Sequence, residues 1–234
     1  LLIQDGQVRA LTALGIPIDG FTFNLLPRIA YVVAVRTFSA STVQPIIGRH
    51  RSLAEKVIVL RLGHRIPRDL RVTTHVCLTA RAFGADELIL ADIVDTALER
   101  TVRDISKRFG GSFQIQMGEP WRQVMKEWKA RGGDIVHLTA YGIPLLQAIH
   151  DIRTSPNPKL VVVGASKVPG EVFELATWNV AVTNQPISEV SALAVFLDRY
   201  FEGRQFSMEF EDAEVKIIPS GRGKQVVNLT ERKN

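Results

Sequence analysis

The chain has 234 residues, 46% of them hydrophobic, and a formal net charge of +5 at pH 7. This composition is typical of a packed globular protein with one large domain or two small ones. The sequence has a single cysteine, Cys77, no signal-peptide pattern and no apolar run near the roughly 18 residues of a membrane span. A membrane protein and an intrachain disulfide are therefore excluded, Cys77 is expected in the core, and we expect a cytoplasmic location.

The first 56 residues show no clear helix or strand periodicity. Turn-forming residues are scattered through them, at Gly15, Pro17, Gly20, Pro27, Pro45 and Gly48. The chain also begins with Leu rather than Met. We expect residues 1–56 to be an appendage, or the product of an over-long reading frame, and assign no function to them.

From residue 57 onward, strand patterns alternate with helix patterns. Strands are predicted over residues 57–62, 87–91, 112–117, 134–138, 159–163 and 178–182, and helices over 74–83, 96–109, 120–131, 143–152 and 188–201. Alternation of this kind predicts parallel strands joined by crossover helices. The strands are almost continuously apolar, which is typical of a parallel sheet covered on both faces.

The pattern changes after Gly203. Residues 206–218 and 225–229 alternate between apolar and polar side chains, with a turn-rich stretch between them. This spacing predicts a β-hairpin. The expected organisation is an unassigned segment over 1–56, one α/β domain over 57–204 and a hairpin extension over 205–234.

Several common signatures are absent from the sequence. No GxGxxG motif follows a strand, and there is no phosphate-binding GxxxxGK[ST] loop. No HExxH, CxxC or GxSxG pattern occurs either, so the usual support for a metalloprotease, a zinc site or a serine hydrolase is missing.

A cluster of basic residues follows the first predicted strand. His64, Arg65, Arg68 and Arg71 fall within eight residues. Ligands of open α/β sheets bind at the carboxyl ends of the strands, and guanidinium groups suit phosphate oxygens. This segment therefore predicts contact with an anionic ligand such as RNA; the alternative is a solvated loop whose arginines pair with Asp69. Residues 57–234 hold 23 basic and 21 acidic residues, so RNA binding must rest on a local patch.

Two further strand ends run into small or polar residues. The sequence after residue 163 is Gly-Ala-Ser-Lys-Val, and the sequence after residue 182 is Thr-Asn-Gln-Pro-Ile-Ser. Small residues let a ligand approach the backbone, and Ser188 can cap the next helix. Each loop alone is an ordinary connection, but together with the segment 138–142 they predict a pocket.

Five fragments, in this order, resemble one protein family: LRLGHRIPRD, RVTTHV, TARAFGA, VVGASKVP and NQPISEV. The family is the archaeal tRNA (cytidine(56)-2′-O)-methyltransferases, within the SPOUT superfamily of knotted methyltransferases. The resemblance covers about residues 57 to 227. It implies a parallel-sheet α/β knot with a C-terminal hairpin, a homodimer, and methylation of the ribose of a T-loop cytidine in tRNA, with no metal.

The resemblance also implies which residues form the site. S-adenosylmethionine would be bound by Leu138, Gly164, Ala165, Ser166, Lys167, Val168, Val182, Thr183, Asn184, Gln185, Pro186, Ile187, Ser188 and Glu189. The basic segment would face tRNA through His64, Arg65, Thr73, Thr74 and His75 and complete the reaction centre across the dimer.

One departure concerns the catalytic arginine. Many knotted ribose methyltransferases place an arginine and an asparagine where this chain has Leu78 and Val72. We therefore favour Arg68 and Arg71 as the catalytic residues over Arg81, which falls in the middle of a predicted helix. His64 and His75 are alternative bases.

Two other functions stay open at this point. The chain could methylate the ribose of a different RNA, because RNA loops are recognised by shape and by unstacked bases. It could also be a knotted RNA-binding module without catalysis.

Overall fold

The computed structural model describes residues 3–4, 7–8, 56–164 and 167–230. The chain divides into two units, Leu1–Gly48 and Arg49–Asn234. In the first unit, strand β1 (Ile3–Gln4) pairs with strand β2 (Gln7–Val8) in antiparallel fashion. The expectation for residues 1–56 otherwise lies outside the described residues.

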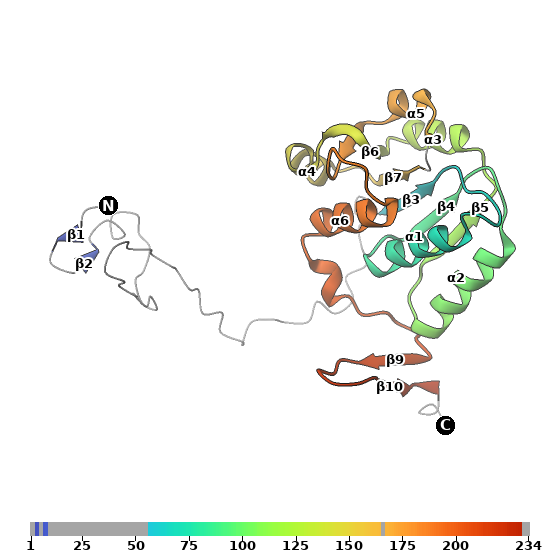
Figure 1. Ribbon diagram of the computed structural model, residues 1–234, viewed down its shortest axis with the longest axis vertical. Helices are drawn as coiled ribbons and strands as arrows, with labels where there is room; N and C mark the ends of the chain where they lie inside the picture. Colours follow the sequence, from blue (N-terminus) through green and yellow to red (C-terminus); the bar gives the residue numbers. More distant parts are fainter. Residues whose placement is uncertain (1–2, 5–6, 9–55, 165–166, 231–234) are drawn as a thin grey trace. The chain divides into compact units, whose positions relative to one another are not determined.

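The second unit is built on one six-stranded parallel sheet (Figure 1). Its strands are β3 (Val57–Arg61), β4 (Glu87–Leu90), β5 (Gln114–Met117), β6 (Asp134–Pro144), β7 (Lys159–Val163) and β8 (Trp178–Ala181), in the order β5-β4-β3-β7-β6-β8. Strands β3, β4 and β7 are buried along their whole length, as their apolar sequences require. The predicted parallel α/β sheet is confirmed.

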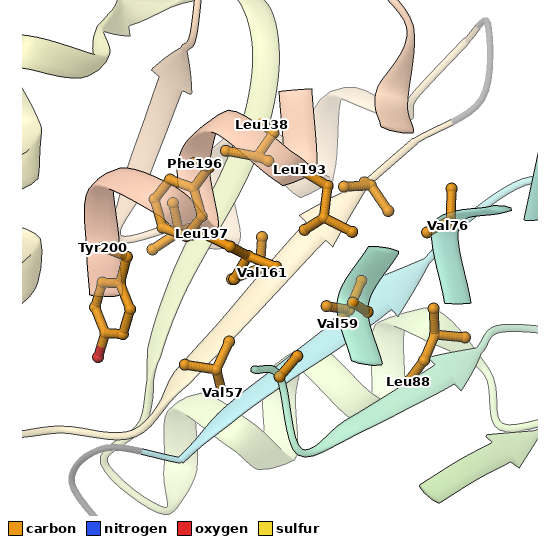
Figure 2. Packing of buried hydrophobic residues seen from close by; sticks show 14 of the residues in the cluster. Val57, Val59, Val76, Leu88, Leu138, Val161, Leu193, Phe196, Leu197 and Tyr200 are labelled. Carbon is orange, nitrogen blue, oxygen red and sulfur yellow. The ribbon is translucent and has the colours of Figure 1, made fainter. Parts of the chain in front are cut away.

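Helices cover both faces of this sheet. One face packs against α1 (Leu70–Ala82), α2 (Thr96–Phe109), α4 (Leu145–Thr154) and α6 (Glu189–Phe201). Figure 2 shows part of this larger core, where Val59 and Val161 of the sheet lie near Leu193 and Leu197 of α6. The other face packs against α3 (Trp121–Ala130) and α5 (Gly170–Leu175). Alternate residues of each strand therefore enter different cores.

Two boundaries differ from the sequence prediction. Helix α1 begins at Leu70 rather than near residue 74, because the amide of Leu70 already donates to the carbonyl of Pro67 in a turn that leads into the helix. Strand β6 continues to Pro144 through an irregularity between Leu138 and Ile143, so the following helix starts at Leu145. The short helix α5 was not predicted at all.

The C-terminal part contains a hairpin of β9 (Val215–Ile218) and β10 (Gln225–Asn228), as predicted. The preceding residues 206–214 were predicted as strand, but they form a 3-10 turn, Arg204–Ser207, and a segment that passes close to Gly110 and Gly111. A Cβ on Gly110 would lie 2.3 Å from the carbonyl oxygen of Glu211, so this segment can dock only on glycine. Docking, rather than strand pairing, explains its apolar residues.

Candidate functional site

A cavity of about 750 Å³ lies at the carboxyl ends of β3, β7, β6 and β8. Three of these strands end in register, because Arg61 is paired with Val163 and Val163 with Leu138. Sequence-predicted site residues in the wall are Arg65, Arg68, Leu138, Gly164, Lys167, Val168, Val182, Thr183, Gln185, Pro186, Ile187 and Glu189. The basic loop and the two small-residue loops thus share one cavity.

The two arginines of the basic loop that line the cavity differ in their contacts. Arg65 donates to Asp69 Oδ2 from its backbone amide at 3.1 Å and from Nε at 2.9 Å. The hydrogen bond from Arg65 holds the pKa of Asp69 below its usual value, against the opposing effect of partial burial. The side chain of Arg68 is 71% exposed and approaches Asp69 only to 3.9 Å. Arg65 is therefore held in the loop, whereas the guanidinium of Arg68 is accessible.

His64 lies beneath the loop and not in the cavity wall. Its Nδ1 is 2.9 Å from Thr73 Oγ1 and its Nε2 is 3.0 Å from Asp95 Oδ2, and all three residues are buried. Burial raises the pKa of Asp95, but hydrogen bonds from the amides of Leu98 and Ala97 and from His64 outweigh it and lower the pKa overall. Both ring nitrogens of His64 are thus used inside the protein, and its contacts with Thr73 and Asp95 anchor the loop.

Arg71, the second predicted catalytic residue, and the remaining members of the predicted RNA-facing set lie on α1. Arg71 and His75 are exposed, and Thr74 uses its hydroxyl within the helix by donating to the carbonyl of Leu70. None of the three lines the cavity. The structure therefore separates Arg68, in the cavity wall, from Arg71.

Gly164 directly follows strand β7 at the cavity. A Cβ at this position would lie 2.1 Å from Cγ2 of Val168, which also lines the cavity. The two following residues of the predicted cofactor loop, Ala165 and Ser166, lie outside the described residues. Any larger residue after the strand would therefore have to displace the side chain of Val168.

The loop after β8 is attached to the loop within β6. The Asn184 side-chain amide donates to the carbonyls of Ala140 and Gly142, at 2.9 and 3.0 Å. Ser188 accepts a hydrogen bond from the amide of Val190 and so caps α6, as expected. Asn184 and Ser188 are therefore not wall residues, but they fix the loops that are.

The cavity wall also contains residues that the sequence did not single out, among them Arg61, His137 and Phe173. Arg61 and His137 lie within strands that read as buried and apolar, and Phe173 belongs to the helix that was not predicted. One indication in the sequence that Arg61 lies at the site is that it is a charged residue at the end of an otherwise apolar strand.

Other expectations concern reactive groups and membranes. Burial raises the pKa of the Cys77 thiol to about 12, so Cys77 is a core residue and no nucleophile at neutral pH. Among the residues that the structure describes, no three His, Cys, Asp or Glu side chains gather as a metal site. Within the same part of the chain, no helix combines the length and apolarity needed to cross a membrane.

Comparisons with known proteins identify relatives of this chain. A family model described as tRNA ribose 2′-O-methyltransferase, aTrm56, matches residues 109–227. The tRNA (cytidine(56)-2′-O)-methyltransferase of Methanopyrus kandleri is 51% identical over 177 residues, which are 76% of this chain and 99% of the relative. That of Thermococcus kodakarensis is 52% identical over 180 residues, again 76% of this chain and 99% of the relative.

A solved structure supports the fold alone. The crystal structure of an RNA 2′-O ribose methyltransferase superposes with a TM-score of 0.51 at 18% identity, covering 68% of this chain and 60% of that one. Since half of the chain matches the family model and three quarters of it matches full-length relatives at about 50% identity, the chain belongs to the tRNA ribose 2′-O-methyltransferase family.

Proposed function

We propose that this protein transfers the methyl group of S-adenosylmethionine to the ribose 2′-oxygen of cytidine 56 in the T-loop of tRNA. The observation that carries the proposal is the shared cavity, where the accessible Arg68 and the loops at Gly164 and Gln185 lie in one wall. Membership of the family and the names of the relatives supply the substrate class.

The residues in the cavity fit the cofactor. A volume of about 750 Å³ lies within the roughly 300–1,000 Å³ range of small-molecule sites. The wall combines apolar side chains such as Leu138 and Ile187 with the charged groups of Arg61 and Glu189, which suits a ligand with an aromatic and a zwitterionic end. The bound cofactor would supply an activated methyl group on a sulfonium.

The residues of the chain then have three tasks. The loops at Gly164 and 182–188 position the cofactor. This matters because holding the methyl group in line with the 2′-oxygen lowers the activation barrier substantially. Arg68 carries an accessible positive charge that favours the alkoxide form of the ribose hydroxyl. Arg65, held by Asp69, contributes positive charge at a fixed place for the RNA backbone.

Arg71, Thr74 and His75 suit a different part of the RNA or a site in a partner subunit, because they lie outside the cavity of their own chain. We infer a homodimer from the family resemblance and from large apolar side chains left exposed. Tyr141, Ile143 and Leu146 lie at the end of β6 and on α4, and Val195 lies on α6, which packs against α4. By contrast Leu193, Leu197 and Phe201 of α6 are buried within their own core, so they are not available to an interface.

The test is mass-spectrometric mapping of methyl groups after incubation with an unmodified tRNA transcript and S-adenosylmethionine. A single new methyl on the ribose of cytidine 56 is expected, and none without the cofactor. A transcript with uridine at position 56 is the control for the target base. Methylation only in another RNA would reassign the substrate, and cofactor binding without any methyl transfer would indicate a non-catalytic RNA-binding module.

A further inference from the structure

Two side chains in the cavity wall are buried and keep polar atoms without a partner. Arg61 is 1% exposed, and its Nε and Nη1 have no hydrogen-bond partner among the described residues. His137 is fully buried, and its Nε2 likewise has no partner there. Buried polar atoms without a hydrogen bond destabilise a protein. A ligand with an acceptor for Arg61 and a donor for His137 would remove this cost.

Arg61 lies on the face of the sheet that carries α1 and α6. Its neighbours on alternate positions of β3, Val57 and Val59, enter the core of that face. Its Nη2 donates to Glu189 Oε1 at 2.9 Å, so one corner of the guanidinium is used and two donor nitrogens remain. A guanidinium with two free N–H groups binds a carboxylate well. The neighbouring carboxylate of Glu189, also in the wall, suits an ammonium group.

His137 lies on the opposite face, beside α5. Asn179 donates from Nδ2 to the carbonyl of Phe173 at 2.9 Å, which turns its Oδ1 toward Nδ1 of His137 at 2.8 Å. Nδ1 must therefore carry the proton, which leaves the lone pair of Nε2 as a hydrogen-bond acceptor. Burial also lowers the pKa of His137, which keeps the ring neutral. The Phe173 ring packs edge-on against the imidazole, with 4.6 Å between the ring centroids, and it also lines the cavity.

The cavity thus spans the carboxyl edge of the sheet with a cation–anion pair on one side and an acceptor beside an aromatic ring on the other. Because Arg61 and Glu189 together complement an α-amino acid, the donor that reaches His137 belongs to the other end of the ligand. Resting on the proposed function, we infer that S-adenosylmethionine lies across this edge, with its methionine carboxylate on Arg61 and its adenine 6-amino group on Nε2 of His137. His137 is then the residue that selects adenine.

The experiment is calorimetric binding of S-adenosylhomocysteine and two analogues, one without the carboxylate and one with purine in place of adenine. The wild-type protein should bind each analogue at least tenfold more weakly than it binds S-adenosylhomocysteine, and this loss of affinity is the penalty for the missing group. Arg61→Met should lose the penalty for the missing carboxylate but keep the penalty for the missing amino group, and His137→Phe should do the reverse. Each variant is thereby the control for the other. Val162→Ala, which changes the residue paired with His137 in β7, should keep both penalties.

Thermal unfolding of each variant checks that it is folded. Arg61→Leu, which removes the charge and the donors, and His137→Leu, which removes the acceptor, give the same comparison if the first variants unfold. If Arg61→Met lost the penalty for the missing amino group and His137→Phe lost the penalty for the missing carboxylate, the proposed orientation of the cofactor would be reversed. If both variants kept both penalties, neither proposed contact would exist. A wild-type protein that does not bind S-adenosylhomocysteine would instead refute the proposed function itself.

Discussion

At the scale of single residues, Arg65 and Arg68 show how two arginines of one loop take different tasks. Arg65 is tied to Asp69 by two hydrogen bonds, so moving it would break contacts within the loop. Arg68 makes no such bond to the residues that the structure describes, and it is largely exposed at the cavity. A side chain that acts only in the transition state has to be available in this way, and Arg68 meets that requirement.

We predict that Arg68→Ala lowers turnover by roughly 100-fold with tRNA affinity nearly unchanged, because its charge would act on the developing alkoxide. Arg71→Ala, which changes an exposed residue of α1, should mainly weaken tRNA binding and make that binding less dependent on salt. The measurements are single-turnover methylation at saturating tRNA and filter binding at two salt concentrations. Arg100→Ala, an exposed arginine on α2, is the matched control. Wild-type turnover in Arg68→Ala together with wild-type tRNA affinity in Arg71→Ala would leave these arginines as a structural basic patch.

A second prediction concerns Asp95, which caps α2 and accepts from His64. Its pKa is lower in the folded protein than its ordinary value of 3.8, so its ionised form stabilises the fold. This stabilisation is fully present above that ordinary value and is lost as pH falls through the lower folded-state pKa. Asp95→Asn should therefore reduce the free energy of unfolding by about 1 kcal/mol near neutral pH.

The difference between wild type and Asp95→Asn should shrink as the pH is lowered below about 4. Urea unfolding from pH 7 down to pH 3 measures it. Asp104→Asn, an exposed acid on the same helix, should show little difference at any pH. A deficit for Asp95→Asn that stays constant over this range would contradict the assignment.

The same residues show the limits of the sequence. The basic cluster at the end of β3 correctly indicated the edge of the sheet where the cavity lies, because parallel strands end together. Sequence spacing could not show that His64 points inward to Thr73 and Asp95, since that depends on where α2 begins in space. Nor could it show that Arg61 faces Glu189, 128 residues away.

At the scale of elements, the strands and most helices were predictable because each carries a clear apolar pattern between turn residues. The start of α1 was missed because Arg71 and Thr73 read as part of a polar loop, although they complete the first turn of the helix. The irregular end of β6 was missed because it depends on close approach to another strand. A Cβ on Gly142 would lie 2.5 Å from the backbone of Asn179 and Val180 in β8.

The end of strand β7, which Gly164 follows, supplies the third prediction. Gly164→Leu should weaken S-adenosylmethionine binding at least tenfold while the protein stays folded, because its side chain would displace Val168 from the cavity wall. Calorimetry and a thermal unfolding curve measure the two effects. Gly170→Ala is the matched control, since a Cβ there meets nothing within 4 Å. Normal binding by Gly164→Leu would show that the pocket is assigned to the wrong loop.

At the scale of the whole molecule, every family fragment and the whole parallel sheet begin at residue 57 or later. Full-length relatives match only 76% of this chain while 99% of their own length is covered. We predict that a chain starting at Lys56 folds, and that it methylates tRNA about as fast as the 234-residue chain. Circular dichroism and the methylation assay, run on both chains in parallel, measure this. An insoluble or inactive shortened chain would mean that the leading segment is integral.

The final prediction concerns assembly. Tyr141 and Leu146 are 90% and 79% exposed, an arrangement that costs solubility unless another surface covers them. Leu146→Glu should convert a dimer into a monomer at micromolar concentration, measured by light scattering. If Arg71 serves the neighbouring subunit, methylation should fall along with the dimer. Val226→Glu, in the hairpin and 58% exposed, should leave the dimer intact. A wild-type monomer with full activity would refute the dimer and assign the whole reaction to the residues of one cavity.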